Sequence, residues 1–410
     1  MKPARVKAAG HGLVAALALA ILLGAGGLLA HGELDARFRT RAQARSIAAL
    51  SQAREALLGY AISYDESHAG QGQGYLPCPD TGNTGSTALG ACGPRGGVAA
   101  GRLPWRTLAL PQLQDGWGEC LWYTVSGSVK HNPKPLALNW DSPGQFRLWR
   151  GDGHSLPAAS PDGLAIAVVF APGPALDGQR RHGAGHAPCT AGTSLNEAGD
   201  FIEAGSDLPS IAISDIHQGQ VGSTIRNDLI TWLGIDDIYD ALRRRSDFAP
   251  RIDHIGETAA LHLASRLTDA DFVARHLHET PHGQLLTGRL AAASELGIAA
   301  PAGSAHDNWR DQFQVALCKD DSDCITVIDP ELPHTASCRA VLLFGGERIR
   351  SGDGRQRRGT AAERADVAQY LEGDNPRHFL LGIAEFHGTA GFRITDPHRP
   401  ASQDVVRCLS

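Results

Sequence analysis

An uninterrupted apolar run near the N-terminus limits what this chain can form more than any other feature. Residues 13–30 read LVAALALAILLGAGGLLA, without a charge, after a start that carries Lys2, Arg5 and Lys7. A run of about 18 apolar residues is near the shortest that spans a bilayer as a helix. A basic start, an apolar run and small residues near Ala30 are also typical of a cleaved signal peptide. The run therefore predicts a membrane anchor or a secretory leader.

The sequence after the run favours the anchor. Residues 33–62 contain no Pro, and their first Gly is Gly59. Apolar residues recur there at helical spacing: Leu50, Ala53, Leu57 and Ala61. We expect one helix over residues 13–64, about 75 Å long. The expected organisation is a basic leader (1–12), a transmembrane segment (13–31), a first lobe (32–247) and a second lobe (248–410).

A stripe of small residues lies within the apolar run. Gly12, Ala16, Ala20 and Gly24 follow one another at four-residue steps. Small residues at this spacing let a second helix approach closely, so these four are candidate helix-packing residues. An Ala- and Gly-rich segment also produces such steps by chance, and both interpretations stay open.

The cysteines predict the compartment. All eight lie C-terminal to the apolar run, and an even number suits disulfide bonds in an oxidising compartment. They are Cys78, Cys92, Cys120, Cys189, Cys318, Cys324, Cys338 and Cys408. Their spacing leaves about 105 connectivities open. We expect a bacterial inner-membrane protein that spans the membrane once, with residues 32–410 in the periplasm or outside the cell.

The soluble part reads as mixed helix and sheet. Residues 65–102 are rich in glycine and form a loop that a bond between Cys78 and Cys92 would close. Three short runs bounded by turn residues read as antiparallel strands: 121–125, 145–149 and 164–170. A helix is expected over 224–245, with Ser223 as its cap. This order predicts an α+β fold in which the long helix packs on a small antiparallel sheet.

The second half repeats the order of the first in six short matches, so the second lobe is expected to be a duplicated α+β unit. The matches are Ala48-Ala49-Leu50 with Ala259-Ala260-Leu261, Gly101-Arg102-Leu103 with Gly288-Arg289-Leu290, Asp115-Gly116-Trp117 with Asp307-Asn308-Trp309, Ala167-Val168-Val169-Phe170 with Val341-Leu342-Leu343-Phe344, Gln179-Arg180-Arg181 with Gln356-Arg357-Arg358, and Phe201-Ile202-Glu203 with Tyr370-Leu371-Glu372.

Residues 10 to about 240 resemble type IV pilin-like and pseudopilin-like envelope proteins, including those of type II secretion systems. The resemblance rests on Gly10 before the apolar helix and on the strings LPCPD (76–80), GRLPWRTL (101–108), DGWG (115–118) and LWYTVS (121–126). It implies a pilin-like fold and helix contacts with other pilin-like subunits. In a standard prepilin, an aromatic residue follows the processing Gly and Glu stands fifth after it; here His11 and Ala15 occupy these positions.

The missing Glu favours a particular place in a filament. A carboxylate within an apolar helix is costly and persists where a neighbour pairs with it. A chain without this Glu needs no neighbouring subunit to pair with the carboxylate. The missing Glu therefore fits a subunit at the end of a filament, or a protein that is not part of a filament.

Motifs for catalysis or metal binding are weak. The sequence has no G-x-S-x-G, H-E-x-x-H or P-loop pattern. Two histidine clusters have ligand-type residues but lack zinc-ribbon spacing: His182, His186 and Cys189, and His276, His278 and His282. Residues 80–86 resemble a calcium loop with too few carboxylates. We expect no catalytic, cofactor-binding or metal site, and no cofactor.

Two further groups allow two interpretations each. Aromatic residues gather in the first lobe and suit its core or a recognition face: Trp105, Trp117, Trp122, Tyr123 and Trp149. The segment from Cys318 to Cys324 reads as a disulfide-closed turn whose acidic tip is solvated or contacts a cationic partner.

The sequence therefore predicts a non-enzymatic, membrane-anchored pilin-like subunit, a minor or tip component of a type IV pilus or type II secretion-type filament. Its expected partners are other pilin-like subunits, through the N-terminal helix, and the inner membrane, with an outer partner unknown. The net charge, 38 − 44 = −6, argues against a nucleic-acid partner. The alternative is an exported enzyme or ligand-binding protein with a site that sequence patterns do not reveal.

Overall fold

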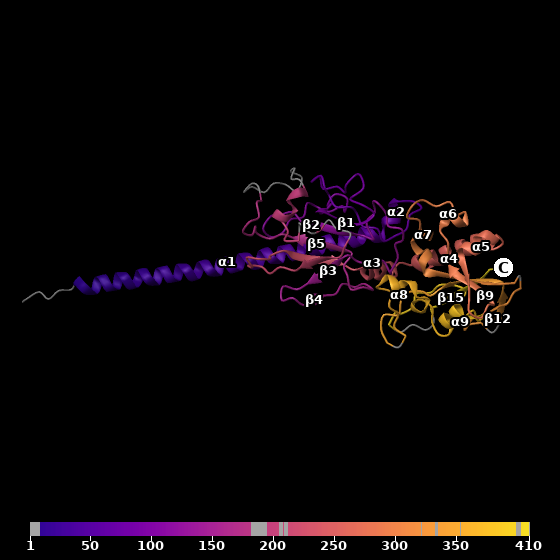
Figure 1. The fold of residues 1–410 in the computed structure, drawn as a ribbon. Coiled ribbons are helices and arrows are strands. Elements are labelled where there is room, and N and C mark those ends of the chain that lie inside the picture. The colour runs from indigo at the N-terminus through magenta and orange to yellow at the C-terminus, as the bar shows by residue number, and fades with distance from the viewer. Residues whose placement is uncertain are drawn as a thin grey trace, which may run out of the picture.

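The computed structural model describes residues 9–181, 195–204, 208, 212–320, 322–332, 335–352, 354–398 and 403–409. Within these ranges, the side chains of residues 9–15, 20, 22–32 and 195–197 lie outside the description. The chain is a mixed helix-and-sheet protein with several small sheets. Figure 1 shows a long helix that leaves a body of two lobes.

The helices begin with α1 (Ala9–Ile62), whose C-terminal part packs on the first lobe. The shorter ones are α2 (Tyr64–Ser67), α3 (Ile235–Leu242), α4 (Phe248–Arg266), α5 (Ala270–His276), α6 (Ala293–Leu296), α7 (Ala305–Trp309), α8 (Ala361–Ala365) and α9 (Asn375–Leu381). The described residues also form the 3₁₀ turns η1 (Leu195–Asp200), η2 (Arg310–Gln312) and η3 (Val367–Gln369).

The first lobe (residues 42–247) holds two sheets. An antiparallel sheet has the order β1-β2-β5-β7, and a small sheet has the order β4-β3-β6. Their strands are β1 (Gly96–Arg102), β2 (Trp122–Gly127), β3 (Phe146–Trp149), β4 (Ser155–Leu156), β5 (Ala167–Ala171), β6 (Ser214–His217) and β7 (Leu229–Leu233). Helix α1 covers β5 and β7, and every residue of β5 is buried.

The second lobe (residues 248–409) repeats this arrangement with one added edge strand, β8. Its larger sheet has the order β15-β13-β10-β9-β8, and its small sheet the order β12-β11-β14. Their strands are β8 (Leu277–Glu279), β9 (Leu285–Arg289), β10 (Phe313–Cys318), β11 (Ile325–Ile328), β12 (Thr335–Cys338), β13 (Ala340–Phe344), β14 (Glu385–His387) and β15 (Val405–Leu409). Helix α4 covers β13 and β15, as α1 covers β5 and β7.

The correspondence extends to strand direction and register. Strand β3 pairs antiparallel with β4 and parallel with β6, and β11 pairs in the same way with β12 and β14. Phe170 pairs with the first residue of β2, and Phe344 with the first residue of β10. The predicted helix match is out of phase, because Leu50 is 3% exposed and Leu261 is 74% exposed. The domain division and a duplication event stay predictions. The structure shows that the strand order of β1-β2-β5-β7 recurs in β9-β10-β13-β15, and that of β4-β3-β6 in β12-β11-β14.

The predicted transmembrane segment, residues 13–31, is wrong. Within the described part of the chain, no helix is both long enough and apolar enough to cross a membrane. Helix α1 is not apolar as a whole, since it continues without a break through Glu33, Asp35, Arg37 and Arg39, which form two ion pairs along its surface. The single-pass inner-membrane location inferred from that segment is corrected with it.

The helix predicted over 224–245 is also partly wrong. Residues Leu229–Leu233 form strand β7, and only Ile235–Leu242 is helical. The sequence LITWL is rich in β-formers, and neighbouring Asp228 and Gly234 bound it as turn residues do. The Ser223 hydroxyl caps no helix and instead accepts bonds from the amides of Ile225 and Arg226.

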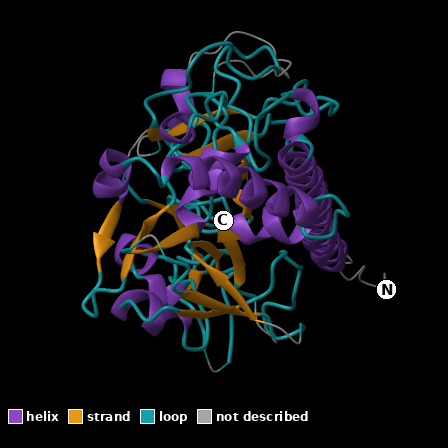
Figure 2. Cartoon of the chain, turned by 90° about the vertical axis from the view of Figure 1, so that its right-hand side faces the viewer, coloured by secondary structure: helices purple, strands orange, loops and turns teal. Residues whose placement is uncertain are grey.

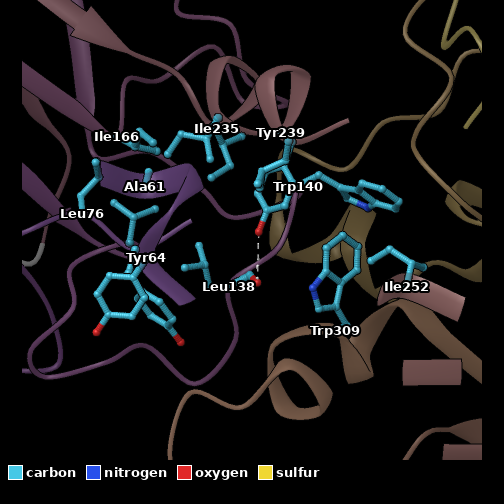
Figure 3. Packing of buried hydrophobic residues seen from close by; sticks show 14 of the residues in the cluster. Ala61, Tyr64, Leu76, Leu138, Trp140, Ile166, Ile235, Tyr239, Ile252 and Trp309 are labelled. Atoms are coloured by element: carbon cyan, nitrogen blue, oxygen red, sulfur yellow. Dashed lines mark hydrogen bonds between the residues drawn. The ribbon is translucent and has the colours of Figure 1, made fainter. Parts of the chain in front are cut away.

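The two lobes share one core. Trp140 of the first lobe is 1% exposed and lies edge-on to Trp309, with ring centroids 4.6 Å apart, and stacked on Phe344 at 5.9 Å. Figure 3 shows Trp140 and Trp309 beside Tyr239 of α3.

Figure 2 looks onto the second lobe, with α1 running back toward the N-terminus. A buried bidentate pair, Arg348 with Asp236, joins the lobes at 2.8 and 2.5 Å.

We predict that Trp140→Ala lowers the free energy of unfolding of the whole chain by about 3–5 kcal/mol, because a large ring is lost from a close-packed core. Urea unfolding followed by circular dichroism measures this. Trp149→Ala, at a half-buried ring on β3, is the matched control and should cost less. Equal losses in the two variants would contradict a core shared through Trp140.

Candidate functional site

The first candidate site is the free arm, residues 9–41 of α1. Every arm side chain in the described part is exposed, and Ala42, at 2%, is the first buried one. Large apolar side chains are uncovered along the arm: Leu17 62%, Leu19 60%, Ile21 63%, Leu34 63% and Phe38 55%. Burying apolar area stabilises by about 25 cal/mol per Å². An exposed row of this kind therefore favours contact with another apolar surface.

Two of these exposed side chains, Leu34 and Phe38, continue the face that α1 buries in the first lobe. Leu34, Phe38, Ala42 and Ser46 follow at four-residue steps, so they lie on one side of the helix. Ala42 and Ser46 are buried against the lobe, whereas Leu34 and Phe38 are more than half exposed, with Phe38 beside Trp117 at the edge of the lobe. One face thus packs inside this chain at one end and is uncovered at the other.

The predicted helix-packing residues lie on this arm. Gly12, Ala16, Ala20 and Gly24 all belong to α1. The Ala16 side chain is exposed, and the other three positions lie outside the residues whose side chains are described. Their role in packing stays a prediction.

The turn at residues 115–118 fixes the base of the arm. The amide of Gly116 donates to the Ser46 hydroxyl at 2.9 Å, and a Cβ at Gly116 would collide with the carbonyl oxygen of Ala42. Asp115 accepts from the amides of Trp117 and Gly173 at 2.8 and 2.7 Å, and burial raises its pKa. The Asp-Gly-Trp string of the pilin-like resemblance therefore holds the helix close to the lobe.

The second candidate site is a buried polar cluster that each lobe contains once. In the first lobe, Arg181 donates to the carbonyl of Gly173 at 2.6 Å and to Gln179 Oε1 at 2.7 Å. In the second lobe, Arg358 donates to the carbonyl of Gly346 at 3.1 Å and to Gln356 Oε1 at 2.8 Å. The two arginines and the two glutamines belong to the matched segments 179–181 and 356–358.

Each arginine also lies over an aromatic ring from the last matched segment. The Arg181 guanidinium is 5.4 Å from the ring centre of Phe201, and that of Arg358 is 4.3 Å from Tyr370. Contacts between a cation and a ring contribute about 0.5–2 kcal/mol, more when water is excluded. The clusters therefore secure the segment that connects the last two strands of each larger sheet, β5 to β7 in the first lobe and β13 to β15 in the second.

Two carboxyl groups complete each cluster. The amide of Glu203 donates to Asp228 Oδ2 at 2.9 Å, and that of Glu372 to Asp404 Oδ2 at 2.9 Å. Burial raises the pKa of Asp404 to about 8, with a smaller effect from the neighbouring Glu372. Burial likewise raises the pKa of Asp228, and Glu203 adds to the effect. With a pKa near 8, Asp404 holds a proton at neutral pH.

The clusters differ in their surroundings. Arg358 is fully buried and also contacts Asp141 of the first lobe, Nη1 to Oδ2 at 3.3 Å. Arg181 pairs with Glu119 of its own lobe at 3.4 Å. The second cluster therefore also ties the lobes together.

Disulfide bonds are confirmed, with three described: Cys78–Cys92, Cys318–Cys324 and Cys338–Cys408. Cys120 is disulfide-bonded as well, and Cys189 lies outside the described residues. The first bond closes the glycine-rich loop, and the third joins β12 to the last strand.

The histidine clusters acquire no ligand geometry in the part of the chain that the structure describes, where no three His, Cys, Asp or Glu side chains gather for a metal. His182, His186 and Cys189 lie outside that part. His276 faces Glu295 at 3.3 Å and contacts the Phe272 ring.

The structure also shows the surroundings of the other sequence candidates: the calcium-like loop, the aromatic residues and the acidic turn. Asp80 binds the amides of Gly82 and Gly85 at 3.0 and 2.6 Å, which is a turn and not a calcium loop. Trp122 and Tyr123 are buried, whereas Trp105, Trp117 and Trp149 are half-buried. In the acidic turn, Asp320 accepts from Ser322 at 2.6 Å, and Asp321 lies outside the description.

Sequence reasoning matched the arginine and aromatic segments but missed Asp228 and Asp404. A signal was present, since an amide residue precedes each aspartate: Asn227-Asp228 and Gln403-Asp404. The pair stands at the start of the last strand of each sheet.

No family model, no curated protein sequence and no solved structure matches the chain.

We predict that Asp404→Asn reduces the pH dependence of stability. The folded-state pKa lies near 8, above the ordinary 3.8, so between these values the folded chain holds a proton that the unfolded chain releases. Stability contributed by this group is full below pH 4 and is lost as pH rises toward 8, by up to about 1.4 kcal/mol per unit. Urea midpoints at pH 5, 6, 7 and 8 measure the slope.

The control is Asp374→Asn, at an exposed position of the same lobe, which should leave the slope unchanged. A slope in Asp404→Asn as steep as in the unchanged chain would show that Asp404 is ionised when folded.

Proposed function

We propose that this chain is a pilin-like assembly subunit, a minor or terminal component of a type IV pilus or type II secretion-type filament. Its free arm packs among the N-terminal helices of other pilin-like subunits, and its two lobes stand at the outer end. The observation that carries the proposal is the uncovered apolar row, with Leu34 and Phe38 continuing the face that is buried from Ala42 onward.

The position of the second lobe supports the terminal place. Arg245 donates to the carbonyl of Ile62, at the end of α1, and pairs with Glu66 at 2.8 Å. Arg251 of α4 pairs with Asp65. Helix α4 thus begins against the end of α1, leaving no room for an arm of its own, so the chain has two lobes and one arm.

The first lobe docks its neighbour with Trp140, in the loop before β3, and with Asp236 of α3, which follows β7. In the second lobe, the corresponding connection from β10 to β11 is short, since it runs only from Cys318 to Ile325. Within the described residues, the second lobe therefore does not repeat the Trp140 loop that docks a lobe, which supports an end position.

Disulfide bonds support an exported protein, because they persist outside the reducing cytoplasm. The alternative function, an exported enzyme or ligand-binding protein, requires a chemical site rather than an arm.

We predict that a photo-crosslinking residue in place of Phe38 captures the N-terminal helix of other pilin-like subunits in producing cells. Peptide mass spectrometry identifies the captured segment. Leu261 is the matched control position, because it is an exposed leucine on the corresponding helix of the second lobe. Capture at 261 equal to that at 38, or capture at 38 of chains without such a helix, would contradict the proposal.

A charge tests the same face. Crosslinking at position 34 should fall at least about tenfold in Phe38→Asp, because docking would bury an unpaired carboxylate. The free energy of unfolding should change by less than about 0.5 kcal/mol, since Phe38 lies outside the lobe cores.

A further inference from the structure

The small sheet of the first lobe turns one face toward solvent. Strands β3 and β6 bury Phe146, Leu148 and Ile216 in the core of the lobe. Successive side chains of a strand point to opposite faces of its sheet, so the alternate residues of β3 and β6 lie on the outer face. In Figure 1, β4 of the same sheet lies at the lower margin of the first lobe.

Four side chains stand on the outer face of β3 and β6 as two neighbouring pairs. Arg147 lies beside Asp215, and Trp149 lies beside His217, in the register of the two parallel strands. The side chains of Arg147 and Asp215 are 46% and 50% exposed, and Trp149 and His217 are half-buried. The outer face therefore combines a charged pair with two flat rings.

The Trp149 indole is held in a fixed orientation. Its Nε1 donates to Asp215 Oδ1 at 2.8 Å, and its ring is 19° from parallel to the His217 imidazole, with the ring centroids 6.2 Å apart. Burial, with a further effect from Arg226, lowers the pKa of His217, so this ring is neutral at pH 7. On the other side, the neighbour of Trp149 is Ser155 of β4, which is small and exposed. A ligand ring can therefore reach the indole from the side of β4.

A hydrogen-bond donor and an acceptor lie next to the indole. Arg147 Nη1 is 3.4 Å from Asp215 Oδ1, and within the described residues neither side chain has a polar partner beyond this contact and the indole. The other N–H groups of Arg147 and the second oxygen of Asp215 are therefore free for a ligand. Two adjacent hydroxyl groups match this arrangement, because one accepts from Arg147 while the other donates to Asp215.

The second lobe offers an internal comparison. Strand β11 pairs with β14 in the register of β3 with β6, so Thr326 lies beside Glu385 and Ile328 beside His387. The acidic residue and the histidine recur, whereas a threonine and an isoleucine replace the arginine and the tryptophan. Of these two small sheets, only that of the first lobe carries the indole and the guanidinium.

We propose that the outer face of β3 and β6 binds a pyranose unit of a glycan, with the sugar ring stacked on the Trp149 indole and its hydroxyls bonded to Arg147 and Asp215. The C–H groups on the face of a pyranose are weakly positive and pack on the negative face of an aromatic ring. The charges of Arg147 and Asp215 cancel, so a neutral sugar complements the pair. The inference goes beyond the proposed function and does not depend on it.

The test is calorimetric titration of the full chain with cellohexaose and with chitohexaose. Both are chains of β-linked pyranoses whose ring substituents are all equatorial, which leaves the ring faces apolar. We expect saturable binding of at least one of them. Trp149→Ile, which places there the residue of the second lobe, should weaken binding at least about tenfold, and Arg147→Thr about 3–10-fold.

The control is Ile328→Ala, at the position of the second lobe that corresponds to Trp149, which should leave the affinity unchanged. If a thermal melt shows that Trp149→Ile is unfolded, Arg147→Thr tests the same face, because its side chain is exposed. No saturable binding of either sugar, or unchanged affinity in the folded variants, would overturn the proposal. Binding of a hexaproline peptide in place of both sugars would also overturn it, by assigning the face to a peptide.

Discussion

The structure depends on one helix whose two ends meet different surroundings. From Ala42 onward, α1 buries its small and apolar side chains against the first lobe, whereas Leu34 and Phe38 on the same face are uncovered. Burial of the first part fixes the direction of the second, because an unbroken helix transmits its orientation. The sheet, the turn at Gly116 and the lobe contact can all be understood as holding this helix in place.

The two lobes pack a helix against a sheet in the same way. Each has a helix across the last two strands of an antiparallel sheet, and each connects these two strands through a segment fixed by a buried arginine, Arg181 or Arg358. The guanidinium supplies several donors in one plane, so a single side chain can satisfy several backbone and side-chain acceptors of a long connection. The lobes differ mainly in their helices: α1 continues beyond its lobe as the free arm, whereas α4 begins at the junction of the lobes.

Local pattern predicted part of this structure. The long helix follows from its 3.6-residue spacing, and three strands follow from short apolar runs between turn residues. The helix expected over 224–245 failed because Ile225, Leu229 and Leu233 satisfy a helical spacing, whereas the residues from Leu229 to Leu233 are rich in β-formers and form strand β7. The transmembrane segment failed because an apolar run was read apart from the charged helix that continues it.

The polar clusters could not be predicted from the sequence, for a different reason. Glu372 and Asp404 are separated by more than thirty residues and acquire their shifted pKa values only when the sheet brings them together in a dry place. The short matches marked the right segments, yet no spacing rule shows that Gly346 offers its carbonyl to Arg358. Non-local chemistry of this kind needs the fold.

The order of the chain gives the packing of α1 a consequence for synthesis. The helix is made first, but the strand that covers most of it, β7, begins at Leu229, long after the helix ends at Ile62. The face around Leu50 and Leu57 is therefore covered only in part, by β5, until more than 160 residues have been added after Ile62. Folding must wait for these distant contacts, which is slow by loop-closure entropy. A chain built in this way benefits from being held unfolded until its last strands are complete.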